Sequence, residues 1–204
     1  MKQPFFERCS VNKKVITESK ELFARCEALA KVNKRAVIVI DGRAASGKST
    51  LADSIAQSLC GHVVHADDFF LPFDMRTADR LSQAGGNIHY ERFAEEVVKK
   101  LDGDFDYGVF SCSEGKVTHH KHIPAHGPVI VEGAYSALPL FGKYYDLLVF
   151  VSASFDARME RIIRRNGTER AEVFRDKWIP LEEHYFETFA IEENADIIFD
   201  TTDA

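Results

Sequence analysis

The sequence predicts an α/β protein in which helices cover both faces of a five-stranded parallel sheet. The first observation behind this class is that short apolar, β-branched runs alternate along the chain with segments of helical periodicity. The second is the segment Gly42–Ser49, which fits the pattern G-x-x-x-x-G-K-[ST] at every position. An apolar run precedes this segment and a helical pattern follows it, which is the strand–loop–helix order that the pattern requires. The chain therefore predicts a P-loop NTPase fold with a small hairpin and lid insertion.

The residues of the loop at Gly42–Ser49 are suited to bind the phosphates of a nucleotide. Its glycines let the backbone curl so that successive N–H groups point at phosphate oxygens. Lys48 adds a positive charge for the β- and γ-phosphates, and the Ser49 hydroxyl can ligate Mg²⁺. A helix predicted over 48–59 directs its positive N-terminal end at the same anion. We therefore expect ATP and Mg²⁺ as cofactors, with the nucleotide held by Gly42, Arg43, Ala44, Ala45, Ser46, Gly47, Lys48, Ser49 and Thr50.

Composition limits the class of protein. With 204 residues, of which 45% are hydrophobic, the chain is expected to form a single domain over 1–204 with a core of its own. The net charge is −6 and there is no long basic run, so nucleic acid is not an expected partner. No segment has the apolar core of a signal peptide or the length of a membrane span, so we expect a cytoplasmic protein without membrane contact. The four cysteines lack metal-ligand spacing and are expected to be reduced thiols. A homo-oligomer is left open.

The first half of the chain is predicted to begin with a helical extension over 1–33, because apolar side chains recur there at steps of three and four. The catalytic core is expected over 36–199. Strands are predicted at 36–40, before the loop, and at 62–66, after the first helix of the core. The polar stretch 73–86, with its Gly-Gly pair, is typical of an excursion that covers a substrate.

The second half is predicted to contain three more strands, a hairpin and three helices. In chain order these are a helix over 90–101, hairpin strands over 105–112 and 116–122, strands over 128–131 and 146–151, helices over 155–165 and 172–193, and a strand over 195–199. Four histidines, at 119, 120, 122 and 126, lie in or near the hairpin. We interpret them as a solvated strand edge rather than a metal site, because no cysteine or carboxylate accompanies them.

Acids stand at three predicted strand ends: Asp41 before the loop, Asp67 with Asp68, and Glu132. In α/β sheets, ligands collect at the carboxyl ends of the strands. A carboxylate beside ATP can hold Mg²⁺ or accept the proton of an attacking hydroxyl. Acids also commonly solubilise loops and cap helices. Because two such ends accompany a phosphate loop, we favour the functional interpretation.

A basic helix provides a second cluster. Arg158, Arg161 and Arg165 are spaced by three and four residues, so they share one helical face. Arginines over a transferring phosphoryl group would offset its developing negative charge. The alternative is a solvated basic face that pairs with Glu160 and Glu169. We expect at least one catalytic arginine here.

Four segments together resemble the uridine kinase and phosphoribulokinase group of P-loop kinases. They are Gly42–Ser49, His65–Phe70, Val131–Gly133 and the helix Arg158–Arg165. The likeness extends over 36–199. It implies an ATP:alcohol phosphotransferase with a five-stranded parallel sheet.

The resemblance also implies roles for single residues. Asp67 matches the catalytic base, which also lies near Mg²⁺, and is ranked ahead of Asp68. Glu132 matches an acid close to the metal. Arg161 and Arg165 fall in the lid helix that closes on the phosphates. The implied catalytic residues are Asp67, Lys48, Arg161 and Arg165, and the implied metal ligands are Ser49, Glu132 and Asp67.

The acceptor side departs from uridine kinases. His89 stands where their ribose-binding acid would be. The segment Phe105–Cys112 keeps the aromatic residues of their base-reading segment but lacks its histidine and arginine. A site without those polar groups discriminates poorly for the original ligand. We expect the acceptor pocket to include Phe70, Arg76, His89, Tyr90 and Tyr107.

Three functions therefore remain open. The first is a kinase of a small-molecule hydroxyl acceptor of the nucleoside class. The second is a kinase of another hydroxylated acceptor, such as a sugar or a vitamin precursor. The third is a regulatory module that binds ATP without an acceptor.

Overall fold

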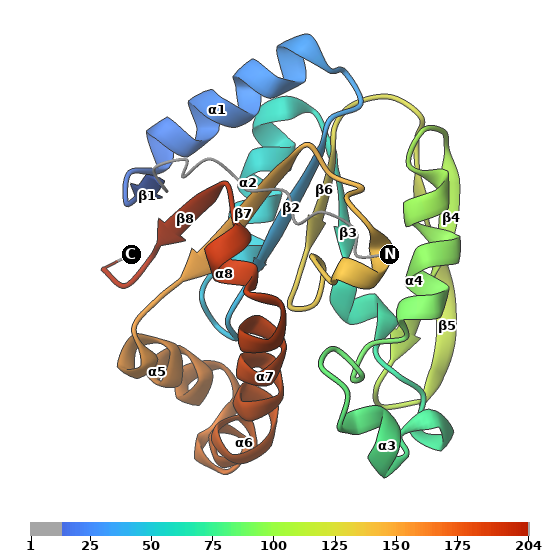
Figure 1. Ribbon diagram of the computed structural model, residues 1–204, viewed down its shortest axis with the longest axis vertical. Helices are drawn as coiled ribbons and strands as arrows, with labels where there is room; N and C mark the ends of the chain where they lie inside the picture. Colours follow the sequence, from blue (N-terminus) through green and yellow to red (C-terminus); the bar gives the residue numbers. More distant parts are fainter. Residues whose placement is uncertain (1–13, 204) are drawn as a thin grey trace, which may run out of the picture.

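The computed structural model describes residues 14–203, and its main sheet consists of six parallel strands (Figure 1). The strands lie in the order β1–β8–β7–β2–β6–β3, and every neighbouring pair is parallel. Their bounds are β1 Lys14–Ile16, β2 Val37–Gly42, β3 His62–His65, β6 Val129–Glu132, β7 Leu147–Ser152 and β8 Ile197–Asp200. Their carboxyl ends therefore meet at one edge of the sheet.

The predicted number of strands, five, is too low by one. Lys14–Ile16 forms the edge strand β1 and pairs with β8, although it lies within the segment predicted as a helical extension. Helix α1 begins only at Ser19 and ends at Val32. Three residues are too few to show a strand period, and it is the pairing with β8 that holds them extended. Residues 1–13, which the same prediction included, lie outside the described part of the chain.

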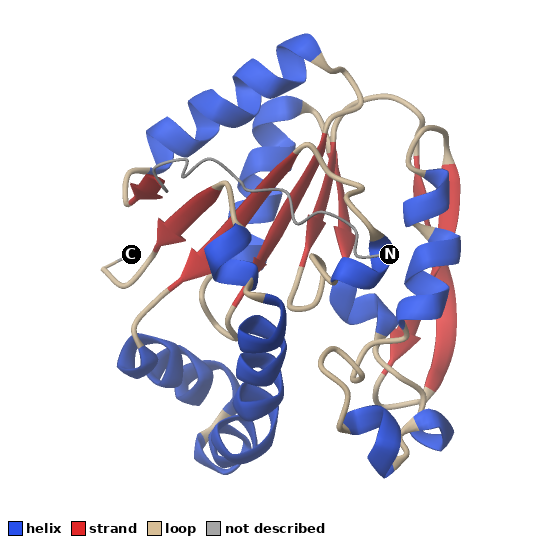
Figure 2. Cartoon of the chain, viewed as in Figure 1, coloured by secondary structure: helices blue, strands red, loops and turns tan. Residues whose placement is uncertain are grey.

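Helices cover both faces of the sheet, as predicted (Figure 2). The main ones are α1, α2 (Lys48–Leu59), α4 (Tyr90–Glu96) and α7 (Ile179–Phe189). Strand β2 is buried throughout, and its side chains alternate between two cores. Ile38 and Ile40 pack with α1 and α2, whereas Val37 and Val39 pack on the face that α4 and α7 cover. Burial on both faces explains why β2 is a continuous apolar run before Asp41.

The predicted hairpin is present and stands beside the β3 edge of the sheet (Figure 1). It consists of β4 (Phe105–Ser111) and β5 (Lys116–Ile123), which pair antiparallel. His119, His120 and His122 are exposed on β5, and His122 pairs with Asp106 across the hairpin. The excursion over 73–86 contains only two short helical turns, η2 (Phe73–Met75) and α3 (Ala78–Leu81). Helix α4 is shorter than predicted, because a 3-10 turn, Val98–Lys100, replaces its end.

The prediction of one long helix over 172–193 is wrong. The chain instead forms α6 (Thr168–Val173), a π-helical segment η5 (Phe174–Trp178), α7 and α8 (Ile191–Asn194). Pro180 near the start of α7 has no N–H for the preceding turn, which favours a break in the regular hydrogen-bond pattern. Ala190 adopts a left-handed conformation, with φ of 49°, and separates α7 from α8. These breaks let η5 and α7 turn toward the carboxyl edge of the sheet.

Within residues 14–203, no helix has the length and apolar character needed to cross a bilayer.

Candidate active site

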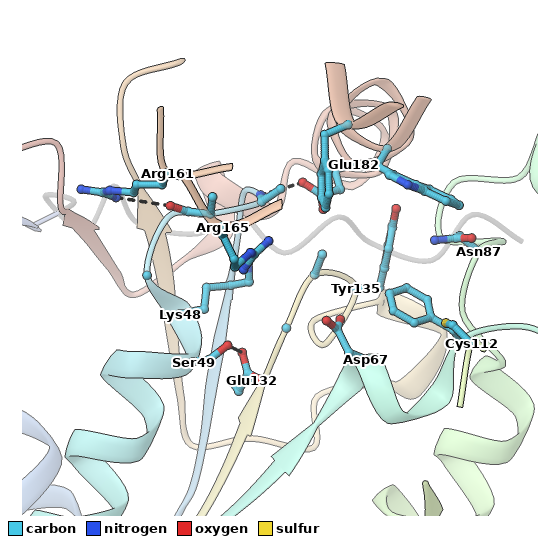
Figure 3. Close-up of a pocket in the computed structure, with 18 of the residues that line it drawn as sticks. Lys48, Ser49, Asp67, Asn87, Cys112, Glu132, Tyr135, Arg161, Arg165 and Glu182 are labelled. Carbon is cyan, nitrogen blue, oxygen red and sulfur yellow. Dashed lines mark hydrogen bonds between the residues drawn. The ribbon is translucent and has the colours of Figure 1, made fainter. Parts of the chain in front are cut away.

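A cavity of about 650 Å³ opens at the carboxyl edge of the sheet, over the ends of β2, β3 and β6 (Figure 3). The phosphate loop, the turns after β3 and β6, helix α5 (Phe155–Asn166) and α7 all contribute to its wall. The residues that line it are Ala44, Ala45, Gly47, Lys48, Ser49, Thr50, Asp67, Phe70, Arg76, Asn87, Cys112, Glu132, Gly133, Ala134, Tyr135, Arg161, Arg164, Arg165, Phe174, Trp178 and Glu182.

A buried carboxylate supports the start of the phosphate loop. Asp41 is fully buried and accepts hydrogen bonds from the Gly42 N–H at 2.7 Å, the Ala137 N–H at 2.9 Å and the Tyr185 hydroxyl at 2.7 Å. Burial raises the pKa of Asp41 to about 6, although these three donors oppose the shift. Asp41 lies outside the cavity lining, so its carboxylate shapes the loop rather than meeting a ligand.

The lysine and serine of the loop face the cavity. Lys48 Nζ donates to the Arg43 carbonyl oxygen at 2.8 Å, across the mouth of the loop. The Ser49 hydroxyl donates to Glu132 Oε2 at 3.2 Å, and Glu132 Oε1 lies 2.6 Å from His65 Nδ1. The hydrogen bond to Glu132 raises the pKa of His65. Glu132 is thereby fixed between the loop and β3.

The oxygen atoms around this point fit a magnesium ion. A hydroxyl from Ser49 and carboxylates from Glu132 and Asp67 line the same cavity, and Mg²⁺ prefers such oxygen ligands. Within the described residues no three His, Cys, Asp or Glu side chains are grouped to hold a metal. A site here would consequently rely on one hydroxyl, two carboxylates and the phosphates of the nucleotide, which is the usual arrangement for Mg²⁺.

The structure separates the two neighbouring acids Asp67 and Asp68. Asp68 Oδ2 faces the hairpin, where it accepts from the Tyr107 hydroxyl at 3.1 Å and from Lys121 Nζ at 2.8 Å. Asp67 is solvent-exposed, and its side chain opens into the cavity. Desolvation by the surrounding protein is the largest cause that raises the pKa of Asp67, and the negative charge of Glu132 adds to the rise. The positive charge of Lys48 opposes it. Of the two acids, only Asp67 faces the phosphate loop across the cavity.

Helix α5 supplies arginines to the opposite wall. Arg161 and Arg165 line the cavity together with Arg164 (Figure 3). Arg161 donates to the Thr201 carbonyl at 2.5 Å and to the Ala45 carbonyl at 3.3 Å, so it ties α5 to the loop. Arg165 Nε donates to the neighbouring Asn166 side chain at 2.8 Å. Arg158, on the same predicted face, is buried and lies outside the lining.

Of the five predicted acceptor residues, Phe70 and Arg76 line the cavity and three do not. His89 caps α4, where its Nδ1 accepts from the Arg92 N–H at 3.3 Å. The Tyr90 ring is covered by the Arg80 guanidinium, 3.6 Å from the ring centroid. Tyr107 is fully buried, and its hydroxyl is held by Asp68. Each of these three side chains is engaged away from the cavity.

Three residues of the phosphate loop also lie outside the lining. Gly42 has a φ of 140°, and a Cβ there would lie 2.2 Å from the Val151 carbonyl oxygen. Arg43 turns away to Glu183, at 2.9 Å, and to Glu192, at 2.8 Å. Ser46 is buried, and its carbonyl oxygen accepts from the Thr201 hydroxyl at 2.7 Å. These residues set the shape of the loop, and its later residues face the cavity.

Neither a family model nor a curated protein matches the sequence. Solved structures do match the fold. One described as a possible uridine kinase from Bacillus stearothermophilus covers 88% of this chain and 100% of its own, with a TM-score of 0.61 and 20% identity. A candidate fructose transport system kinase from Silicibacter covers 87% of this chain and 98% of its own, with a TM-score of 0.64 and 19% identity. The chain has a P-loop kinase fold.

The P-loop kinase fold brings further residues to the cavity that the sequence analysis did not select. They are Asn87, Cys112, Tyr135, Arg164, Phe174, Trp178 and Glu182, with Gly133 and Ala134. Glu182 could have been found, because it occupies the apolar stripe of α7 three and four residues before Tyr185 and Phe186. An acid on a buried stripe requires a partner, and its partner is the Ala44 N–H.

Tyr135, Asn87 and Cys112 lie on the side of the cavity away from Lys48 (Figure 3). Phe70 and Trp178 line the cavity, and Tyr135 adopts a φ of 74°, an unusual value for a residue with a side chain. Asn87 is buried beside Tyr135 and is directed at the same space (Figure 3). The cavity thus presents aromatic side chains and one amide in addition to the phosphate loop.

Proposed function

We propose that the protein is a kinase that transfers the γ-phosphoryl group of Mg-ATP to a hydroxyl group of a small molecule. One observation carries this proposal: Asp67 opens to the same cavity as Lys48, Ser49 and Glu132, while its neighbour Asp68 is committed to the hairpin. Among the described residues, no side chain donates a hydrogen bond to the Asp67 carboxylate. A carboxylate in this position is suited to accept a proton from a substrate hydroxyl.

Each part of the site has a role in this proposal. The amides of the loop and Lys48 bind the phosphates, and Ser49 and Glu132 hold the metal. Mg²⁺, when bound, neutralises charge on the β- and γ-phosphate oxygens. Asp67 takes the proton from the attacking hydroxyl, and its raised pKa makes it a stronger base than an ordinary aspartate. Arg165 faces the phosphates from α5, while Arg161 holds the lid helix against the loop.

A nucleoside is our first choice of acceptor class. The flat faces of Phe70 and Trp178 suit a planar base, and the Asn87 amide can read its edge. The likeness to a possible uridine kinase supports the same class. Uridine itself is less favoured, because His89 caps a helix and the residues that would read a pyrimidine are replaced.

A sugar-like acceptor is the second candidate. The candidate fructose transport system kinase matches this chain as well as the possible uridine kinase does, which supports this acceptor class. Arg76, which lines the cavity, would suit an acceptor that carries a negative charge. Within this proposal the protein works in the cytoplasm, where ATP is available.

The test is release of ADP from Mg-ATP against a panel of hydroxyl acceptors that includes uridine, cytidine and hexoses. We expect acceptor-dependent turnover that EDTA abolishes and that Asp67→Asn lowers by about 10²-fold or more. Asp68→Asn is the matched control, because Asp68 is the adjacent acid and faces the hairpin. Near-normal turnover by Asp67→Asn would refute the assignment of the base. ATP hydrolysis that no acceptor stimulates, together with partner-dependent binding, would favour a regulatory module.

A further inference from the structure

The carboxylate of Glu182 occupies a hydrogen-bond donor of the phosphate loop. Its Oε2 accepts from the Ala44 N–H at 2.7 Å, a short distance typical of a charge-assisted bond. Glu182 projects from α7, is 9% exposed and lines the cavity beside the loop (Figure 3). The amides of such a loop are the donors that bind phosphate oxygens. A carboxylate and a phosphate cannot share this donor, because both are anionic acceptors.

Within the described residues, the bond from the Ala44 N–H is the only hydrogen bond of the Glu182 carboxylate, and no cation pairs with it. Lys48, whose charge acts on Glu182, donates its hydrogen bond to the Arg43 carbonyl oxygen. Burial raises the pKa of Glu182 to about 7, and the Asp67 charge adds to the rise, while Lys48, the Ala44 N–H and Arg158 oppose it. A charged Glu182 is therefore disfavoured at this position, and additional negative charge from phosphates would disfavour it further.

Arg158 is a second buried group in this region, and part of its guanidinium lacks hydrogen-bond partners in the described part of the chain. Arg158 of α5 is 4% exposed, and among the described residues neither its Nε nor its Nη1 has a hydrogen-bond partner. Its Nη2 lies 3.9 Å from Glu183 Oε1, a weak contact for a buried guanidinium. Buried polar groups are rarely left without a partner. This contact places Arg158 against the residue next to Glu182 on α7, and the positive charge of Arg158 lowers the pKa of Glu182.

We propose that Glu182 is an internal competitor for the phosphate loop. An incoming nucleoside triphosphate displaces its carboxylate from the Ala44 N–H, and the carboxylate then pairs with the Arg158 guanidinium. This inference rests on the proposed function in one respect, that the loop binds ATP. The exchange links nucleotide binding to the packing of α7 against α5. Glu183 and Glu192 do not compete for the loop amides, because both bind the Arg43 side chain.

The test is the dissociation constant for Mg-ATP, measured by calorimetric titration without any acceptor. Glu182→Gln keeps an oxygen for the Ala44 N–H but removes the charge, and we expect the constant to fall about fivefold, a modest but measurable gain. Glu182→Ala should tighten binding in the same direction. Glu187→Gln is the matched control, an exposed acid on the same helix outside the cavity lining, and should change the constant less than about twofold. Thermal melts confirm that each variant is folded.

Arg158 supplies the second half of the test. Arg158→Met removes the receiving partner, so we expect Mg-ATP to bind several times more weakly in a chain that keeps Glu182. In the Glu182→Gln background the same change should have little effect, because no charge has to be received. Equal effects of Arg158→Met in both backgrounds would overturn the exchange. Unchanged or weaker ATP binding by both folded Glu182 variants would overturn the competitor role.

The failure of the proposed function gives a different result. If neither the wild-type chain nor any variant binds Mg-ATP, both the kinase proposal and this inference fail. If the Glu182 variants bind Mg-ATP more tightly but no acceptor is phosphorylated, the competitor role stands and the kinase proposal fails.

Discussion

The Tyr185 hydroxyl donates a hydrogen bond of 2.7 Å to Asp41 Oδ2, and it thereby ties α7 to the end of β2 immediately before the phosphate loop. Both residues are fully buried. Glu182 stands three residues earlier on α7 and contacts the same loop at Ala44. Helix α7 consequently holds Asp41, the carboxylate that shapes the loop, and also competes for one of the loop amides. Any movement of α7 must therefore reach the phosphate site.

Asp41→Asn should destabilise the protein even though it removes a buried charge. An asparagine can offer an oxygen at only one of the two carboxylate positions, so its amide group would face either the Gly42 N–H or the Ala137 N–H. We expect the free energy of unfolding to fall by about 1–3 kcal/mol, measured by urea denaturation at pH 7. Asp53→Asn, at an exposed position on α2, is the control. An equal stability of the two variants would contradict the supporting role of Asp41.

Gly42→Ala should be far more disruptive than the same change at Gly103. The φ of 140° and the 2.2 Å approach to the Val151 carbonyl oxygen leave no room for a Cβ, so either the loop or β7 must shift. We expect loss of detectable ATP binding and a fall of more than about 2 kcal/mol in the free energy of unfolding. Gly103→Ala, where nothing lies within 4 Å of the added Cβ, should change both measurements little.

Arg165→Met should lower kcat by roughly 10²-fold and change the KM for ATP much less, because an arginine at the transferring group acts mainly in the transition state. Steady-state kinetics with the acceptor found in the panel measures both constants. The control is Arg170→Met, an exposed arginine on α6 that lies outside the cavity lining. A change in KM alone would instead make Arg165 a binding residue.

Glu182 should make stability depend on pH in a direction that follows from its raised pKa. The pKa of Glu182 is about 7 in the folded protein, compared with 4.5 for an unperturbed glutamate in the unfolded chain. The folded state therefore binds the proton more tightly. The contribution of Glu182 to stability is full below pH 4.5 and is lost as the pH rises through about 7. At about 1.4 kcal/mol for each pH unit, the contribution is on the order of 3 kcal/mol.

The comparison that isolates this contribution is between the wild-type chain and Glu182→Gln. The free energy of unfolding of the wild type minus that of Glu182→Gln should decrease as the pH rises from 4.5 to 7. Urea denaturation at each pH measures both values. Asp41 and Asp67 titrate in both proteins, so their slopes cancel. A difference that stays constant over this interval would show that Glu182 does not titrate as inferred.

The sequence by itself determined the elements whose signals are local. The phosphate loop is defined by the spacing of Gly42, Gly47, Lys48 and Ser49, and α2 has the predicted bounds because the loop fixes where it begins. The buried strands β2, β6 and β7 can be recognised in the sequence as apolar runs, because each is covered on both faces. The parallel sheet follows from their alternation with helices.

Only the tertiary structure decided which side chains meet. Asp67 and Asp68 are adjacent acids that the sequence could only rank, and it is the hairpin, through Tyr107 and Lys121, that draws Asp68 away from the cavity. Strand β1 exists because β8 lies beside it, and α7 reaches the loop because the predicted long helix is broken at η5. These outcomes depend on contacts between residues far apart in the chain, and neither spacing nor propensity records such contacts.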